Sequence, residues 1–455
     1  MDLNPVAPET AAWLQAVEVG SERWWQAVAK LGAPLCEPVA EDTYCITFLW
    51  RDPAGDESRS ATHRVYIDVN SVTNHHAFDP ESLQRIAGTD VWYWQVLLPA
   101  SWRGSYAFIP VDASLLPPMA EGTLEDRRDR HRQWWRSVMG LAQADALNPL
   151  PPHASGWAGM LSALHLPGAP DQSAWRVHDR GEGKGQAAQH LKKLHWKSDL
   201  LGNQRTVWVY ACGQADTPAE QLARPLVLLL DGQHWAERMP IFSALEARTE
   251  AGDLPAAVYV LIDVIDGGYR QAELSCNPLF WQAVQHELLP WVAGLVPSSS
   301  KPARTVVAGQ SLGGLAALYA GLHHPQRFGA VLSQSGSFWW PYVELLQAPP
   351  GEACPRKPGS RGRLAELLTD GTLPPGHLRV FLEVGSREDV MIDLNDSVHE
   401  GLCQAGHAVA YQQFEGGHDW LCWRGGLLDG LAWLLAAPSG TRTDTALPMS
   451  ADQAR

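Results

Sequence analysis

The sequence lacks the long apolar runs and the excess of positive charge that mark two broad classes of protein. No stretch approaches the roughly 18 consecutive apolar residues that cross a bilayer, so we expect no membrane partner. Lys and Arg number 35 against 50 Asp and Glu, which gives a formal net charge of -15 at pH 7. Because a nucleic acid is a polyanion that proteins meet with a basic surface, we expect no nucleic-acid partner either.

Paired cysteines are missing as well. The seven cysteines are scattered and form no CxxC pair, a pattern typical of free thiols in a reducing compartment. The opening residues, MDLNPVAPETAAWLQ, show no basic segment followed by an apolar one, so they do not resemble a secretory signal. We therefore expect a cytoplasmic protein.

Tryptophan, by contrast, is abundant, with 21 Trp against 10 Tyr and 9 Phe. Such large rings fill cores and domain contacts; the alternative is a set of flat rings that receive an aromatic ligand. The length of 455 residues exceeds one ordinary domain, and the 45% apolar content suits a well-packed globular protein. Two domains are therefore expected.

The first part of the chain predicts a β-rich domain over residues 1–163. Residues 1–40 have a helical pattern. Short segments rich in β-branched and aromatic residues follow, bounded by turn residues at near-regular intervals, as in an antiparallel sandwich; they are 42–52, 63–72, 91–99 and 104–112. A charged helix is expected at 124–140, and the Pro- and Gly-rich stretch 164–186 is expected to link two domains.

The second domain is expected over residues 187–437, followed by a tail at 438–455. Here strands alternate with helices, and RPLVLLLDG (224–232) is the continuous apolar run of a strand buried on both faces. Alternation of this kind predicts a mainly parallel sheet flanked by helices. The expected fold is thus an α/β hydrolase preceded by a β-sandwich-like domain.

The stretch VVAGQSLGG (306–314) predicts a nucleophile elbow at Ser311. Glycines two residues before and after the serine, Gly309 and Gly313, allow the tight strand-to-helix turn that holds the hydroxyl out. The alternative is a glycine-rich turn with an idle serine. A serine hydroxyl is scarcely ionised at neutral pH, so catalysis also requires a base.

The chain order serine, acid, histidine in α/β hydrolases points to His418 as that base, because it follows the last predicted strand and precedes the last helix. The acid is expected in the loop SREDVM, where Glu388 and Asp389 both qualify; we prefer Glu388 and hold Asp389 as the alternative. Either carboxylate would orient the imidazole and stabilise its charged form. A merely solvated charged loop is the competing interpretation.

The oxyanion hole is expected to use the N–H of Leu312, directly after the nucleophile, and an N–H near Gly232 or Gln233. The sequence has no HExxH motif, no Cys/His cluster and no dinucleotide-binding glycine fingerprint. We therefore expect no protein-held metal and no cofactor.

Several segments together resemble the enterochelin (enterobactin) esterase family. They are FLWRD (48–52), GTDVWYWQVLLPASWRGSYAFIP (88–110), LLLDGQHWAERMPIFSALE (228–246), IDVIDGGYRQAELSCNPLFWQAVQHELLP (262–290), GQSLGGLAALYAGLHHPQRFGAVLSQSGSFWW (309–340) and EGGHDWLCWRGGLLDGL (415–431). The resemblance covers most of the chain in both expected domains. It implies a cytoplasmic serine esterase that acts on a ferric siderophore.

The resemblance also implies a substrate: a trilactone of three dihydroxybenzoyl-serine units that holds Fe(III) through six catecholate oxygens. Ser311 would attack a serine-ester carbonyl and His418 would move the proton. Iron would enter only as part of the substrate. Cleavage would destroy the preorganised chelate and ease iron release.

Such a trianion with flat rings implies cationic and aromatic contacts. Arg270 is expected to meet catecholate oxygens. Further positive charge is expected from Arg387 and Arg424, and ring stacking from Trp235, Trp420 and Trp339. The sandwich is expected to wall one side of the cleft. Two other functions stay open: a carbohydrate-linked aryl or acyl ester hydrolase or acyltransferase of the same fold, and a degenerate enzyme that only binds the siderophore.

Overall fold

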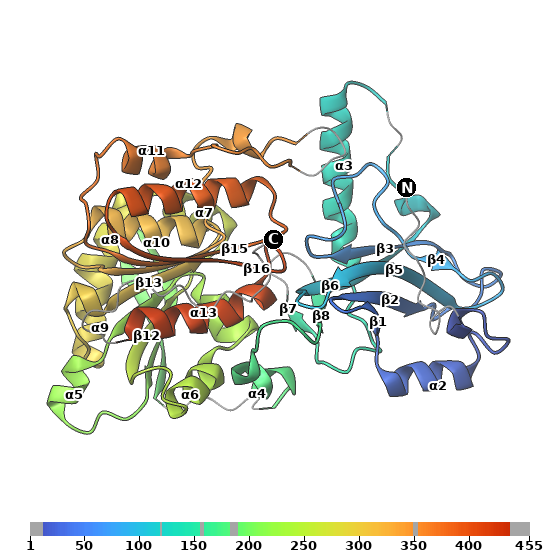
Figure 1. Ribbon diagram of the computed structural model, residues 1–455, viewed down its shortest axis with the longest axis horizontal. Helices are drawn as coiled ribbons and strands as arrows, with labels where there is room; N and C mark the ends of the chain where they lie inside the picture. The colour runs from blue at the N-terminus through green and yellow to red at the C-terminus, as the bar shows by residue number, and fades with distance from the viewer. Residues whose placement is uncertain (1–11, 119–120, 155–158, 183–189, 349–353, 437–455) are drawn as a thin grey trace.

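The computed structural model describes residues 12–118, 121–154, 159–182, 190–348 and 354–436. Two domains lie side by side: a smaller one built from the first part of the chain and a larger one built from the rest (Figure 1). Among the helices that the structure describes, none has both the length and the apolar character needed to cross a membrane.

The smaller domain is a sandwich of two four-stranded antiparallel sheets, with orders β1-β2-β5-β4 and β3-β6-β8-β7. Its strands are β1 (Leu35–Ala40), β2 (Thr43–Arg51), β3 (Thr62–Val69), β4 (Gln84–Arg85), β5 (Val91–Pro99), β6 (Arg103–Asp112), β7 (His153–Ala154) and β8 (Met160–His165). Apolar side chains of both sheets meet in one core that includes Phe48 of β2, Ile67 of β3 and Phe108 of β6. This core arises because alternate residues of each strand face inward.

Two helices cover the sandwich. Helix α2 (Glu22–Leu31) begins at the N-cap Ser21, and α3 (Leu124–Val138) begins with a capping box at Thr123. The helical pattern expected over 1–40 ends early, because residues 35–40 form β1 instead. Strand β1 lies at a sheet edge, where Pro38 is tolerated and pairing with β2 outweighs local helix propensity.

The larger domain is built on one eight-stranded sheet of order β16-β15-β14-β13-β11-β12-β10-β9. Its strands are β9 (Leu191–Ser198), β10 (Asn203–Cys212), β11 (Leu226–Leu229), β12 (Ala257–Ile262), β13 (Thr305–Gln310), β14 (Ala330–Gln334), β15 (Arg379–Gly385) and β16 (Ala408–Phe414). The strands from β16 to β12 are parallel, whereas β10 pairs antiparallel with both β12 and β9. The sheet is therefore mainly parallel, as expected for an α/β hydrolase.

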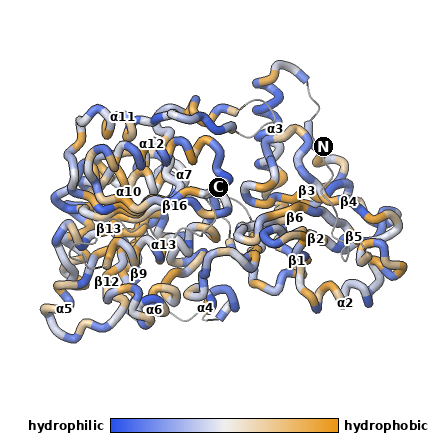
Figure 2. Tube along the Cα trace, in the orientation of Figure 1, coloured by the Kyte–Doolittle hydropathy of each residue, from blue (hydrophilic) through white to orange (hydrophobic). Residues whose placement is uncertain are grey.

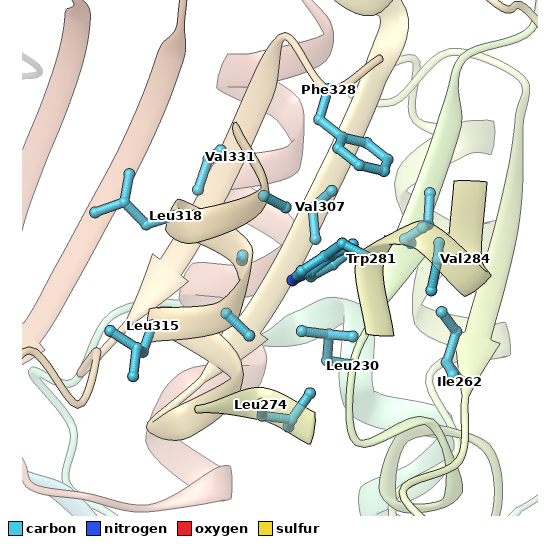
Figure 3. Packing of buried hydrophobic residues seen from close by; sticks show 14 of the residues in the cluster. Leu230, Ile262, Leu274, Trp281, Val284, Val307, Leu315, Leu318, Phe328 and Val331 are labelled. Carbon is cyan, nitrogen blue, oxygen red and sulfur yellow. The ribbon is translucent and has the colours of Figure 1, made fainter. Parts of the chain in front are cut away.

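Helices cover both faces of this sheet. They are α5 (Pro218–Ala223), α6 (Phe242–Glu250), α7 (Gly267–Leu274), α8 (Pro278–Ala283), α9 (Leu289–Leu295), α10 (Leu312–His323), α11 (Arg363–Thr369), α12 (Val390–Gln404) and α13 (Trp420–Leu435). On one face Trp281 and Phe328 pack against Val307 of β13 and Leu315 of α10 (Figure 3). On the other, α6 and α13 cover side chains such as Leu229 and Leu332. Apolar residues gather on these inner strands and helix faces (Figure 2).

The expected linker is structured where the structure describes it. Helix α4 (Arg176–Asp179) lies against the larger domain, and Asp179 accepts two hydrogen bonds from Arg424, at 2.6 and 2.8 Å. Gln172 donates to the backbone carbonyl of Leu421 at 3.1 Å. The described part of this stretch therefore packs against the larger domain and is not a free linker.

Candidate active site

Ser311 occupies a strained turn between β13 and α10. Its backbone has φ 58° and ψ -120°, a region that residues other than glycine rarely adopt. A Cβ on Gly309 would lie only 2.4 Å from the carbonyl group of Gly313, so the turn closes this tightly only with glycine there. The Ser311 N–H donates to the carbonyl of Gln334 at 2.9 Å. The turn thus holds the serine hydroxyl at the carboxyl end of the sheet, in the geometry of a nucleophile elbow.

His418 and Glu388 meet beyond the ends of β16 and β15. Nδ1 of His418 lies 2.6 Å from Oε2 of Glu388; the carboxylate side chain is 2% exposed and the imidazole 40%. Since a carboxylate accepts hydrogen bonds, Nδ1 carries the proton here and Nε2 is left as a base.

The structure brings Glu388 to His418 and leaves Asp389 out of this contact. Oε1 of Glu388 accepts hydrogen bonds from the Ser335 hydroxyl at 2.5 Å and from the Gly385 N–H at 2.8 Å. Asp389 instead precedes α12, with φ 46°, and burial raises the pKa of its carboxyl. The two adjacent acids thus have different surroundings.

Trp423 supports the pair from α13. Its Nε1–H donates to the Ser335 hydroxyl at 2.9 Å, and its ring meets the His418 ring edge-on, with centroids 4.6 Å apart. A chain of hydrogen bonds therefore runs from Trp423 through Ser335 and Glu388 to His418. Such a chain fixes the orientation of the Glu388 carboxylate, and the carboxylate in turn fixes the orientation of the imidazole ring.

The expected oxyanion donors lie next to the elbow. Leu312 is the first residue of α10, so its N–H has no acceptor within the helix. Gly232 and Gln233 follow β11, and a Cβ on Gly232 would come within 2.4 Å of the backbone N of Ile262. The preceding residue, Asp231, has φ 53°. This second turn is therefore as tightly shaped as the elbow itself.

Ser311 and His418 line one cavity of about 350 Å³ between the two domains. Leu161 of β8 and Asp68 of β3 contribute to its wall from the sandwich, and Gln233 contributes from the larger domain. The sandwich thus walls one side of the cavity. A volume in this range is typical of sites for small organic ligands.

Arg270 and Trp420 are the two expected ligand contacts that reach this cavity. Arg270 is already paired: its Nε and one terminal nitrogen donate to the two carboxylate oxygens of Asp231, at 2.6 and 2.8 Å. Burial acts to lower the pKa of Arg270, but the charge and hydrogen bonds of Asp231 outweigh it, and the net pKa is raised. Trp420 is half-buried and stacks on His234, with centroids 3.7 Å apart.

Burial excludes two of the expected ligand contacts, Trp235 and Arg424. Trp235 is 0% exposed, and its Nε1–H donates to the side chain of Gln310, so its ring belongs to the core. Arg424 is 1% exposed, and its charge is matched by Asp179. Neither side chain can stack on, or neutralise, a ligand in the cavity. Their sequence positions beside the motifs did not reveal which way they point.

Two other expected contacts lie elsewhere. Arg387 pairs with Glu415 at 2.6 Å, and Trp339 is half-buried against the core of the larger domain. Neither is among the described residues that line the cavity. The prediction that Arg387 and Trp339 contact the ligand is therefore wrong.

Several polar residues of the cavity wall were missed from the sequence. They include Asp68, Asn70, Ser105, His153, Asp231, His234, Arg238, Asp266 and Asp419. Burial, with a smaller contribution from Asp419, raises the pKa of Asp68 to about 6. Burial holds the pKa of His234 well below its usual value, so this ring is neutral at neutral pH. The available signal was weak, since Asp68 merely falls within the predicted strand 63–72. In the part of the chain that the structure describes, no group of three or more His, Cys, Asp or Glu side chains is arranged to hold a metal ion.

Both domains match known protein families. Residues 45–175 match the family described as "Enterochelin esterase, N-terminal", and residues 198–434 match the family described as "Putative esterase". The chain is also similar to the iron(III) enterobactin esterase of Dickeya dadantii, with 49% identity over 93% of this chain and 95% of the relative.

Solved structures of the same kind are similar throughout. The enterobactin esterase of Shigella flexneri, crystallised in the presence of enterobactin, is 42% identical with a TM-score of 0.77, over 92% of this chain and 99% of that one. The ferric enterobactin esterase of Salmonella typhimurium is 42% identical with a TM-score of 0.79, over 91% of this chain and 98% of that one. The similarity thus includes the sandwich as well as the α/β domain.

Proposed function

The chain belongs to the enterochelin esterase family, and on that premise we propose that it hydrolyses the serine-ester bonds of the trilactone siderophore enterobactin. The reacting bond is a carboxylic ester, and the products are dihydroxybenzoyl-serine units. One observation carries the assignment of the chemistry: Ser311 of the strained elbow lines the same interdomain cavity as His418, and the buried Glu388 holds His418 from behind. Nucleophile and base thus face one space that an ester can enter, and the orienting acid contacts the base from the protein interior.

The reaction begins at Ser311. Its Oγ attacks the ester carbonyl carbon while Nε2 of His418 takes the hydroxyl proton. Glu388, hydrogen-bonded to Nδ1, stabilises the imidazolium that forms without itself taking the proton. The N–H of Leu312, with that of Gly232 or Gln233, donates to the oxyanion of the tetrahedral intermediate.

Collapse of this intermediate breaks the bond between the carbonyl carbon and the seryl oxygen. His418 returns its proton to that leaving oxygen, and an acyl group stays on Ser311. Water then attacks the acyl-enzyme with His418 again as base, which releases a free carboxylate and restores the serine hydroxyl. Three such cycles convert the trilactone into three monomers.

The cavity is suited to catechol rings in two respects. Trp420 offers an aromatic face at its wall, and the exposed Arg238 offers a cation. We extend the proposal to the Fe(III) complex of the siderophore, in which iron is cargo of the substrate and the protein supplies no cofactor. We also propose that the reaction takes place in the cytoplasm, where the scattered cysteines would remain as thiols.

The alternative, a carbohydrate-linked ester, is not favoured. The part of the chain outside the α/β fold matches the amino-terminal domain of enterochelin esterases. That domain supplies wall residues such as Asp68 and Leu161, so it shapes the same cavity that holds Ser311.

A product time course by liquid chromatography and mass spectrometry tests the proposal. The full chain is given iron-free and ferric enterobactin, with Ser311→Ala as the control. We expect linear trimer, dimer and dihydroxybenzoyl-serine to appear only with the intact serine. If the folded protein cleaved a simple activated ester but left both forms of the trilactone intact, the proposed substrate would be wrong and the esterase activity would stand.

A further inference from the structure

The loop that carries His418 is held from two sides. Residues 415–419 join β16 to α13, where the two domains meet (Figure 1). The larger domain holds the imidazole through Glu388 at 2.6 Å. The sandwich holds the backbone of the same residue, because the side-chain N–H of Asn70 donates to the carbonyl of His418 at 3.1 Å. The candidate base thus contacts both domains.

Asp419, the next residue, contacts the sandwich through both of its carboxylate oxygens. One of its carboxylate oxygens accepts from the backbone N–H of Ser105 at 2.6 Å, and the other accepts from the Ser105 hydroxyl at 3.0 Å. The second oxygen also accepts from the N–H of Leu421 at 3.0 Å and so caps α13. A single buried carboxylate therefore joins the start of α13 to β6.

His153 of β7 completes this cluster. Its Nε2 lies 2.9 Å from the Ser105 hydroxyl oxygen. The hydroxyl has one proton, which it donates to Asp419, so Nε2 of His153 must donate in turn. Burial lowers the pKa of His153, which keeps the ring neutral with one N–H. His153, Ser105 and Asp419 are 6%, 3% and 5% exposed and lie in the wall of the cavity, so a lost bond would leave a largely buried polar group without its partner.

The backbone around His418 is equally confined. A Cβ on Gly417 would lie 1.7 Å from the hydroxyl oxygen of Ser71, which follows β3. On the far side, the Cys422 thiol donates to the carbonyl of Arg103 at 3.2 Å. The loop therefore rests directly on the sandwich before and after the histidine.

We propose that Ser105 and Asp419 are positioning residues for the esterase reaction, through which the sandwich holds the His418 loop in reactive geometry. Glu388 fixes one atom of the ring, but the position of Nε2 relative to Ser311 also depends on where the loop backbone lies. A misplacement of about 1 Å can slow an enzymatic reaction on the order of 100-fold. The inference rests on the proposed role of His418 as base, and it gives the sandwich a part in catalysis beyond lining the cavity.

The test compares full-length Asp419→Ala, Asp419→Ser and Ser105→Ala. Serine is a good N-cap, so Asp419→Ser keeps the cap of α13 and loses the bonds to Ser105. Ser162→Ala is the matched control, since Ser162 is an equally buried serine of the sandwich that bonds the N–H of Asp145. The measurements are kcat and KM for a small p-nitrophenyl ester and for the trilactone, with the melting temperature of each variant.

We expect both Asp419 variants to lower kcat by roughly 10- to 100-fold on both substrates, with KM within about twofold. Ser105→Ala keeps the backbone bond and is expected to lose about threefold to tenfold. Ser162→Ala is expected to keep the wild-type kcat even if its melting temperature falls as far as those of the Ser105 and Asp419 variants. The positioning role would be overturned if Ser105→Ala and Asp419→Ser kept the wild-type kcat. It would also be overturned if these variants only raised KM for the trilactone. If Ser311→Ala or His418→Ala retained turnover, the proposed function itself would fail instead.

Discussion

Oε2 of Glu388 lies 2.6 Å from Nδ1 of His418, and the two side chains differ sharply in exposure, at 2% and 40%. The buried partner is fixed by two further hydrogen bonds, from Ser335 and Gly385. The open partner faces the cavity that holds Ser311. A buried acid that orients an accessible histidine is the arrangement required of a residue that acts first as general base and then as general acid.

Glu388→Gln is expected to lower kcat by roughly 10³- to 10⁴-fold, because an amide cannot stabilise the imidazolium and favours the wrong tautomer. The matched control is Asp389→Asn, since asparagine has the shape of aspartate and removes only the charge at that position. We expect the control to stay within about twofold of wild type in kcat for a p-nitrophenyl ester. The reverse ranking would make Asp389 the acid.

Arg270→Ala is expected to damage stability and rate together. Its removal would leave the carboxylate of Asp231, whose side chain is 3% exposed, without its cation, at a cost of about 3–5 kcal/mol in the free energy of unfolding. The turn at Gly232 would shift as well, so kcat should fall on large and small esters alike. Urea unfolding and kinetics on both esters measure this.

The double variant Asp231→Asn with Arg270→Ala is the control for that pair. It removes the unpaired charge, so it should regain part of the lost stability. A fall in affinity for the ferric siderophore alone, with stability and small-ester kinetics intact, would instead show that Arg270 reads the catecholate directly.

Arg238→Gln is expected to raise KM for the ferric trilactone by about twofold to fivefold, because one exposed cation contributes only modestly to binding a trianion. KM for a neutral p-nitrophenyl ester should not change, and added salt should reduce the difference between variant and wild type. Arg304→Gln, an exposed arginine at the opposite end of β13, is the control. An equal rise in the control would remove Arg238 from the site.

Asp68 is expected to make binding of the ferric siderophore depend on pH. Because the pKa of Asp68 is raised to about 6, its carboxyl is neutral below that pH and becomes negative as the pH rises through it. The added negative charge on the cavity wall repels a trianion, so Kd should increase across this range. Tryptophan quenching in the Ser311→Ala background, with and without Asp68→Asn, measures the effect. Parallel pH profiles for the two proteins would contradict it.

Much of the fold could be predicted because the inner strands of the larger domain, such as β11, β12, β13 and β14, are buried on both faces. Segments 224–232 and 304–309 contain continuous apolar runs, and the strands β11 and β13 that they form are buried at every position, which leaves little choice of secondary structure. Residues 35–40 show the limit. Their strand conformation comes from pairing with β2 and not from any pattern of their own.

The sequence by itself predicted the chemistry, because the glycines that flank Ser311 and the place of His418 after the last strand are local patterns. Only the tertiary structure decided between Glu388 and Asp389, since adjacent residues point in different directions and only one reaches the imidazole. Burial likewise removed Trp235 and Arg424 from the cavity. The contact of Ser105 with Asp419 joins residues 314 apart, and no local pattern can encode a bond that depends on how two domains pack.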